Sequence, residues 1–166
     1  MRALLVRHAI AADRALASGP DVGRPLTPDG VRRFRRGARA LAALVPELEA
    51  IFTSPLVRAR QTADLLAAAH PGAPTLSEVP ELEPGAGSLA ILELLRARKS
   101  LAAVGLVGHE PDLSLLEGHL LTGGNRSLAD FRKGGAALID FPGRVAAGSG
   151  VLLWHLTAGQ LRKLAP

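Results

Sequence analysis

The stretch Arg2-Ala3-Leu4-Leu5-Val6-Arg7-His8, near the start of the chain, decides the fold. Its apolar residues form a short continuous run, which is typical of a strand buried on both faces of a sheet. Two strongly polar side chains, Arg7 and His8, come directly after this run. We therefore expect a central strand over residues 2–7, with two candidate functional side chains at its carboxyl end.

The rest of the chain alternates between helical and strand-like segments. Thr27-Pro28 is typical of a helix N-cap followed by proline in the first turn, and apolar residues recur behind it at helical spacing through Val45. Ser54-Pro55 repeats this pattern, and Ser88 is expected to cap a further helix. The expected strands are residues 2–7, 50–53, 75–79, 102–107, 136–141 and 151–157, and the later helices run from Pro55 to about Ala69, from Leu89 to about Arg98 and from Pro111 to about Leu121.

This alternation predicts an α/β fold, a three-layer α/β/α sandwich with a mostly parallel sheet. The last two expected strands lie close together along the chain, and such a short connection allows one strand to pair in the antiparallel direction. The chain has 166 residues and shows no internal repeat or low-complexity segment. A single domain over residues 1–166 is therefore expected.

Composition narrows the class of protein. Hydrophobic residues make up 48% of the chain and aromatic residues only 3%, so the core is expected to consist of Leu, Val, Ile and Ala. The absence of cysteine excludes disulfides and thiolate chemistry. Arg7 interrupts the first apolar run too early for a signal peptide, and no apolar run approaches the ~20 residues that cross a membrane. We expect a cytoplasmic protein without a membrane partner, and its net charge of +5 favours anionic partners only weakly.

Candidate functional residues follow several of the expected strands. Arg7 and His8 end the first strand, and His109 ends the strand at 102–107. Arg58 lies in the first turn of the helix that follows the second strand. Glu81 follows the weak strand near residue 77. Ligands of open parallel sheets bind at the carboxyl ends of the strands. We therefore expect these residues, distant in sequence, to converge at one edge of the sheet.

These residue types suit the chemistry of a phosphoryl group. Guanidinium groups offer paired donors to its oxygens, and Arg58 near a helix N-terminus adds to the positive end of the helix dipole. An imidazole attacks phosphorus only when it is neutral, and two arginines should lower the pKa of His8 below ~6.5, the ordinary value. His109 can donate a hydrogen bond to a phosphoryl oxygen. No metal ion is needed if these groups supply the positive charge.

Each candidate also has an ordinary structural interpretation. Arg58 could be a solvated helix residue, Glu81 an exposed turn carboxylate, and His109 a loop residue bonded to the backbone. The other histidines, His70, His119 and His155, are interpreted as structural. The basic stripe Arg32–Arg39 is interpreted as a solvated helix face, because few aromatic residues are available to stack on bases. A nucleic-acid partner is therefore unlikely.

Several motifs together resemble those of the histidine phosphatase (phosphoglycerate mutase-like) superfamily. Leu5-Val6-Arg7-His8 is similar to its Arg-His-Gly signature, and Arg24-Pro25-Leu26-Thr27 with Gly30 is similar to the entry into its first helix. Residues 54–63 (SPLVRARQTA) resemble its Ser-Pro…Arg-Ala…Gln-Thr-Ala motif. Val107-Gly108-His109 resembles its later Gly-His element. Order and approximate spacing agree over residues 5–111, whereas the last third matches only in strand pattern.

The resemblance implies a role for each matched residue. His8 would be the nucleophile that carries the phosphoryl group, and Arg7, Arg58 and His109 would bind the phosphate. Glu81 would be the proton donor, and the reaction would pass through a phosphohistidine intermediate that water hydrolyses, without a cofactor. Ala9 stands where the family has glycine, which predicts ordinary backbone dihedrals there.

The length of one connection bears on the substrate. Between the helix ending near Ala69 and the one beginning near Ser88, the Pro-rich segment is too short for a helical lid. The chain most resembles the small SixA-type phosphohistidine phosphatases, so the expected partner is a phosphorylated protein, with phosphohistidine on a phosphorelay domain. Two alternatives stay open: a phosphomonoesterase for sugar, nucleotide or cobalamin-precursor phosphates, and a non-catalytic module that binds phosphate. In each case a phosphate or sulfate-like anion is expected in the site.

Overall fold

The computed structural model describes residues 1–14 and 20–166 of the chain. Its centre is a six-stranded sheet in the order β3-β2-β4-β1-β5-β6. The pairs β1–β4, β2–β4 and β2–β3 are parallel, whereas β5 is antiparallel to both of its neighbours, β1 and β6. One strand, β5, therefore runs against the others, as predicted. The strands are β1 (Arg2–Arg7), β2 (Leu48–Thr53), β3 (Thr75–Glu78), β4 (Ala103–Gly108), β5 (Ala136–Asp140) and β6 (Val151–Leu156).

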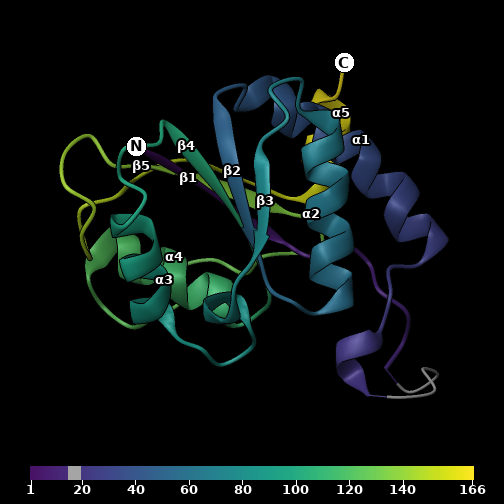
Figure 1. Cartoon of the computed structure of the whole chain (residues 1–166), viewed down its shortest axis with the longest axis horizontal. Helices are drawn as coiled ribbons and strands as arrows, with labels where there is room; N and C mark the ends of the chain where they lie inside the picture. Colours follow the sequence, from purple (N-terminus) through teal and green to yellow (C-terminus); the bar gives the residue numbers. More distant parts are fainter. Residues whose placement is uncertain (15–19) are drawn as a thin grey trace.

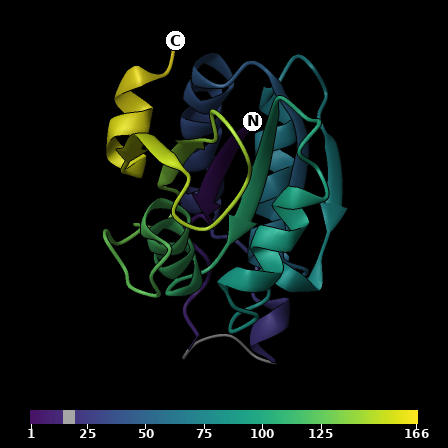
Figure 2. The same cartoon turned by 90° about the vertical axis from the view of Figure 1, so that its left-hand side faces the viewer.

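Helices cover both faces of the sheet, which confirms the predicted three-layer α/β/α sandwich (Figure 1). One layer holds α1 (Pro28–Leu44), α2 (Val57–Ala69) and α5 (Ala158–Leu164), and the other holds α3 (Ser88–Arg96) and α4 (Asp112–Thr122). Figure 2 shows β6 and α5 at one edge of the sheet and β3 at the other. Two short 3-10 turns, η1 (Asp21–Gly23) and η2 (Pro80–Leu82), complete the described elements.

The two sides of the sheet carry separate hydrophobic cores. Successive side chains of a strand point to opposite faces. In β1, Leu4 and Val6 accordingly pack with Phe34 of α1, whereas Leu5 packs with Phe131 on the side of α3 and α4. Residues 3–6 are fully buried, which is why this strand reads as an uninterrupted apolar run.

The first turn of α1 is fixed against the loop that follows His8. Thr27 is the N-cap, and its side-chain oxygen accepts a hydrogen bond from the backbone N–H of Gly30 at 2.9 Å. A Cβ atom on Gly30 would lie 2.2 Å from the carbonyl oxygen of Ile10, so only glycine fits there. The close approach joins α1 to the segment that carries the candidate residues.

Two predicted helix caps are wrong. Helix α2 begins at Val57 rather than at Pro55, and Ser54 does not cap it, because the N-cap is Leu56, whose backbone is extended. Ser88 is the first residue of α3 rather than its cap, which is Gly87 with a φ of +88°. Helix α5 was not predicted, although Thr157 and Gln160 form a capping box at its start. Among the described residues, no helix is both long and apolar enough to cross a membrane.

Candidate active site

Four of the five predicted site residues meet at the carboxyl ends of the parallel strands. Arg7 ends β1, His8 follows it, His109 follows β4, and Arg58 lies in the first turn of α2. All four line a hollow of about 370 Å³. The rest of its lining is Arg14, Asp21, Arg24, Pro84, Glu110 and Lys133. The hollow therefore has five Lys or Arg residues and two carboxylates.

The backbone fixes the orientation of the His8 ring. Its Nδ1 donates a hydrogen bond to the carbonyl oxygen of Ala9 at 2.8 Å. The Nε2 atom therefore carries the lone pair and is the nucleophilic nitrogen. Ala9 has no positive φ, as expected, since Ala73 is the one non-glycine residue with positive φ in ranges 1–14 and 20–166. An ordinary alanine thus supplies the carbonyl that holds the ring.

His8 is neutral at physiological pH. Burial lowers its pKa to about 3, with further lowering by the nearby His109, Arg58 and Arg7. The predicted direction of the shift is confirmed, but its main cause is loss of solvent rather than the two arginines. A neutral ring with a free Nε2 is the form that can attack phosphorus.

This pKa can be tested without a substrate. In an NMR titration, the ring resonances of His8, identified by their loss in His8→Gln, should shift with a midpoint far below the ordinary ~6.5. Between about pH 3 and the ordinary value, the native state binds fewer protons here than the unfolded chain. The contribution of His8 to the free energy of unfolding should therefore decrease as the pH falls through that range. A midpoint close to the ordinary value would contradict the buried, neutral ring.

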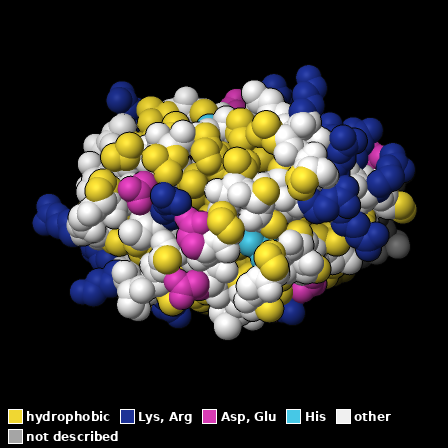
Figure 3. Space-filling model, turned by 90° about the horizontal axis from the view of Figure 1, so that it is seen from above, with side chains coloured by type: hydrophobic (Ala, Val, Ile, Leu, Met, Phe, Trp, Pro, Cys, Tyr) yellow, Lys and Arg dark blue, Asp and Glu magenta, His cyan; other side chains and the backbone are white. Residues whose placement is uncertain are grey.

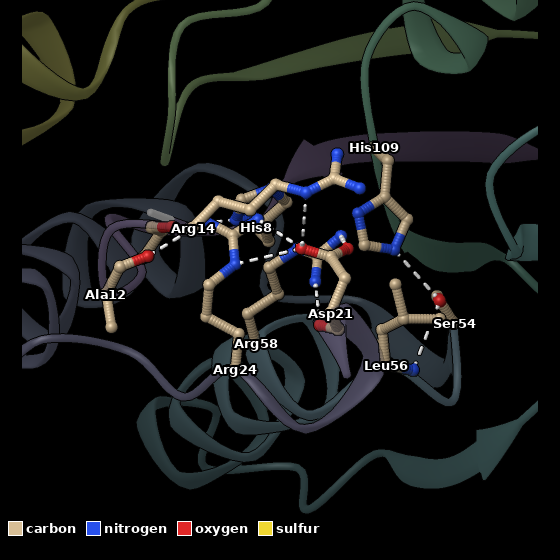
Figure 4. Close-up of polar contacts among 10 residues, drawn as sticks. His8, Ala12, Arg14, Asp21, Arg24, Ser54, Leu56, Arg58 and His109 are labelled. Atoms are coloured by element: carbon tan, nitrogen blue, oxygen red, sulfur yellow. Dashed lines mark hydrogen bonds and ion pairs between the residues drawn. The ribbon is translucent and has the colours of Figure 1, made fainter. Parts of the chain in front are cut away.

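His109 offers a proton to the hollow. Its Nε2 lies 2.9 Å from Oγ of Ser54, and the same Oγ accepts a hydrogen bond from the backbone N–H of Leu56 at 3.3 Å. The Ser54 hydroxyl can therefore donate to Nε2, and in that tautomer the neutral ring carries its proton on Nδ1. That Nδ1 is buried without a hydrogen-bond partner and points toward His8 and Asp21 (Figure 4). Burial, together with Arg58, lowers the pKa of His109 to about 4.

The last third of the chain holds Arg7 in place. The Arg7 guanidinium donates a hydrogen bond to the carbonyl oxygen of Phe131 at 2.6 Å. Phe131 is in turn fixed by Glu110, whose Oε1 accepts a hydrogen bond from the Phe131 backbone N–H at 3.0 Å. Gly134, with a φ of +74°, donates from its backbone N–H to the carbonyl oxygens of Arg7 and His8. The loop before β5 is therefore part of the site.

Asp21 is the main site residue that the sequence analysis missed. The Arg58 guanidinium donates to the backbone carbonyl of Asp21 at 2.9 Å and to its Oδ2 at 3.0 Å. Arg24 donates to Oδ1 at 3.1 Å, and Arg14 lies 4.0 Å from it (Figure 4). Although burial acts in the opposite direction, Arg58 and Arg24 hold the pKa of Asp21 below its usual value. Asp21 lies on η1, away from any expected strand, so no pattern in the sequence marked it as a site residue.

The structure does not place Glu81 in the hollow with the other candidates. Glu81 lies in η2, and its Oε2 atom is buried without a hydrogen-bond partner. Pro84 and Glu110 line the hollow instead of Glu81. The role of proton donor for Glu81 stays a prediction.

Two further histidines have structural partners. The Nδ1 of His70 is 2.8 Å from the carbonyl oxygen of Leu66, within α2. His155 lies 2.8 Å from the buried Glu117 carboxylate, and its ring packs on Phe131 with a centroid distance of 4.4 Å. These contacts agree with the structural interpretation of both residues.

Comparison with known proteins gives the same family as the motifs. Residues 3–84 match the model of the histidine phosphatase superfamily (branch 1). An uncharacterised protein of Picosynechococcus sp. is 44% identical over 115 residues, which are 68% of each chain. The solved protein histidine phosphatase SixA with tungstate has a TM-score of 0.84 and 26% identity, and the alignment covers 97% of this chain and 99% of that one.

Two solved structures with lower identity share the fold. A putative phosphohistidine phosphatase SixA of Agrobacterium tumefaciens has a TM-score of 0.76 and 24% identity over 94% of this chain and 97% of that one. A putative α-ribazole-5'-P phosphatase of Escherichia coli has a TM-score of 0.73 and 18% identity over 95% and 97%. The motifs of residues 5–111, the family match, the relative and the shared fold all lead to one assignment: the chain belongs to the histidine phosphatase superfamily, and this membership indicates a phosphatase.

Proposed function

We propose that the chain is a metal-independent phosphohistidine phosphatase whose His8 carries the phosphoryl group between two steps. The observation that supports this most is the His8 ring, which is neutral, has its free Nε2 beside the catalytic hollow with its five Lys and Arg residues, and is oriented by the Ala9 carbonyl. We also propose that residues 1–166 act as one catalytic domain, because the residues that line the hollow come from the first strand through to Lys133 in the last third of the chain. We further propose that this domain acts in the cytoplasm.

The chemistry of the first step follows from this geometry. Arg7 and Arg58 bind the phosphoryl oxygens, and Nδ1–H of His109 donates to one of them. The lone pair of His8 Nε2 forms a bond to phosphorus while the bond to the substrate's leaving nitrogen breaks. The positive charge that develops on His8 is shared through Nδ1–H with the Ala9 carbonyl. The leaving imidazole keeps the bonding electron pair and takes a proton from solvent.

Water completes the reaction in the second step. It attacks phosphorus on the phosphorylated His8, the bond from Nε2 to phosphorus breaks, and phosphate leaves with the proton balance restored by solvent. Five Lys or Arg residues around the hollow supply the positive charge that a metal ion would otherwise provide. These residues are why we propose chemistry without a metal.

Two features favour a phosphohistidine over an ester as substrate. The segment between α2 and α3 contains only β3 and η2 as regular elements, so no helix covers the hollow from that side. Among residues 1–14 and 20–166, the titratable groups that line it besides the cations are Asp21, His8, His109 and Glu110, and Asp21 is held ionised by its arginines. A phospho-imidazole needs little help from an acid when it leaves. The 26% identical SixA structure, a protein histidine phosphatase, supports the same choice.

The proposal is tested by comparing substrates and trapping the intermediate. With a histidine-phosphorylated phosphotransfer domain, kcat/KM should be far higher than with sugar, nucleotide or α-ribazole phosphates. A rapid quench should also show an acid-labile phosphoryl group on the wild-type chain. Much faster cleavage of the small esters would favour the phosphomonoesterase, and a protein that binds phosphate without any trapped intermediate would be a non-catalytic module.

Glu81 gives a sharper comparison between substrate classes. If Glu81 donates a proton to the leaving group, Glu81→Gln should slow phosphate esters about 10²-fold or more and phosphohistidine much less, because an ester oxygen needs the proton more. The measurement is kcat for both substrates in the same preparation. Equal effects on the two substrates would remove the acid role from Glu81, and Glu83→Gln, an exposed neighbour, is the matched control.

A further inference from the structure

A second hollow opens beside the catalytic one. Its volume is about 480 Å³, and it shares two lining residues, Arg7 and Lys133, with the catalytic hollow. Three more cations line it: Arg33, Arg132 and Arg162. The remaining lining residues are small or uncharged, and no carboxylate lines it among the described residues. We call it the cationic hollow.

Different elements bring the cations of this hollow together. Arg33 comes from α1 and Arg162 from α5, two helices that pack against each other. Arg132 and Lys133 precede Gly134, whose N–H binds the carbonyl oxygens at the end of β1, so the loop brings these cations next to the site. Figure 3 shows Lys and Arg side chains gathered at the end of the molecule where α1 lies, on the right in both views.

Few local partners neutralise these side chains. Arg33 Nε pairs with Asp29 at 2.6 Å, which leaves the terminal nitrogens of its guanidinium for other anions. Arg132 and Lys133 are exposed to solvent. Exposed cations with one carboxylate among them create a positive potential that attracts an anionic partner and weakens with salt.

The phosphoryl group alone does not account for this charge. It carries about two negative charges, and the catalytic hollow already offers five cations against two carboxylates. Arg33, Arg132 and Arg162 line only the cationic hollow of the two. They are therefore available to negative groups that lie elsewhere on the substrate.

We propose that the cationic hollow docks an acidic surface next to the phosphohistidine of a protein substrate, which makes it a specificity site of the enzyme. This inference rests on the proposed function. A protein fits better than a nucleic acid because, in the part of the chain that the structure describes, no aromatic residue lines the hollow to stack on bases. A rim of exposed charges also acts mainly on the rate of encounter with a folded partner.

The chain offers a matched pair of double variants for the test. Arg33→Gln with Arg162→Gln removes two charges from the cationic hollow. Arg39→Gln with Lys163→Gln removes two exposed charges from the same helices, α1 and α5, at positions that do not line it. Each is assayed with phosphoramidate, which is small enough to use the catalytic hollow alone, and with a histidine-phosphorylated phosphotransfer domain that has carboxylates beside its histidine.

With the phosphorylated domain at low ionic strength, the first double variant should lose about tenfold or more in kcat/KM, whereas the control should lose little. Both should cleave phosphoramidate at nearly the wild-type rate. Replacing the carboxylates of the phosphorylated domain by amides should slow the wild-type enzyme and leave the first variant almost unaffected. High salt should remove most of the difference.

The possible failures are distinguishable. If the wild-type chain cleaves the phosphorylated domain well and the two double variants behave alike, docking at the cationic hollow is wrong and the proposed function stands. If the wild-type chain cleaves only small esters, the proposed function fails and the docking inference fails with it. If the first variant is impaired only toward small substrates with a second phosphate, the hollow is a subsite for that phosphate and protein docking is overturned.

Discussion

His8→Ala is expected to lower the rate of phosphoryl hydrolysis by about 10⁴-fold or more, because it removes the nucleophile on which both chemical steps depend. The nearby His109 ring, 5.1 Å away between centroids, is not expected to take its place, because its Nε2 is bound to Ser54. The measurement is the initial rate with phosphohistidine and phosphoramidate, together with the acid-labile label on the quenched protein.

The label is the stronger part of this test. Wild type should carry it, and His8→Ala should not. His119→Gln, a change at a histidine in α4 that does not line the catalytic hollow, should keep both the label and the rate. An acid-labile phosphoryl group that persists in His8→Ala would mean that another residue is the nucleophile.

Arg58→Ala is expected to reduce kcat by about 10²- to 10³-fold, the usual cost of removing one preorganised donor from developing charge. Arg58 is 5% exposed, and Asp21 fixes its guanidinium through two hydrogen bonds. Such a group is oriented before the substrate arrives, and a phosphoryl oxygen needs to displace only the Oδ2 contact of Asp21 to reach it. Separate determination of kcat and KM with phosphohistidine is the appropriate measurement.

A control for this change lies one half-turn further along α2. Arg60 pairs with Asp64 and Glu78 at the surface, and Arg60→Ala should leave kcat unchanged. Arg58→Lys should recover part of the lost rate, because it restores charge without the paired donors. If Arg58→Ala raised KM a few-fold at constant kcat, Arg58 would contribute to ground-state binding alone.

The sequence predicted the parts of the site that depend on buried strands. β1 and β4 read as unbroken apolar runs because both faces of the sheet are covered, and their ends therefore placed Arg7, His8 and His109 correctly. Parallel pairing of β1 with β4 then brings Arg7 opposite Gly108, the residue before His109. This convergence follows from topology alone, so one sequence was enough to predict it.

The residues that were missed depend on contacts without a local pattern. Ser54 before Pro55 has the sequence of a helix cap, yet its hydroxyl binds His109, which lies 55 positions further along the chain. Phe131 acts through its backbone carbonyl, and any residue type has that group. Asp21 lies on a three-residue 3-10 turn that shows no periodicity. In each case the partner is fixed by tertiary packing.

The ion pair between Asp21 and Arg58 means that the site contains an anion tethered to the chain itself. A carboxylate held on the same chain competes at an effective concentration that can reach about millimolar or more. A dissolved monovalent anion must exceed that concentration to occupy Arg58, and it brings no additional charge or acceptor oxygens. A phosphoryl group brings a second charge and extra acceptor oxygens, which Arg7, Arg14 and Arg24 around the same hollow can bind. A phosphorylated ligand therefore displaces the tethered carboxylate more readily than a monovalent anion of the same concentration does.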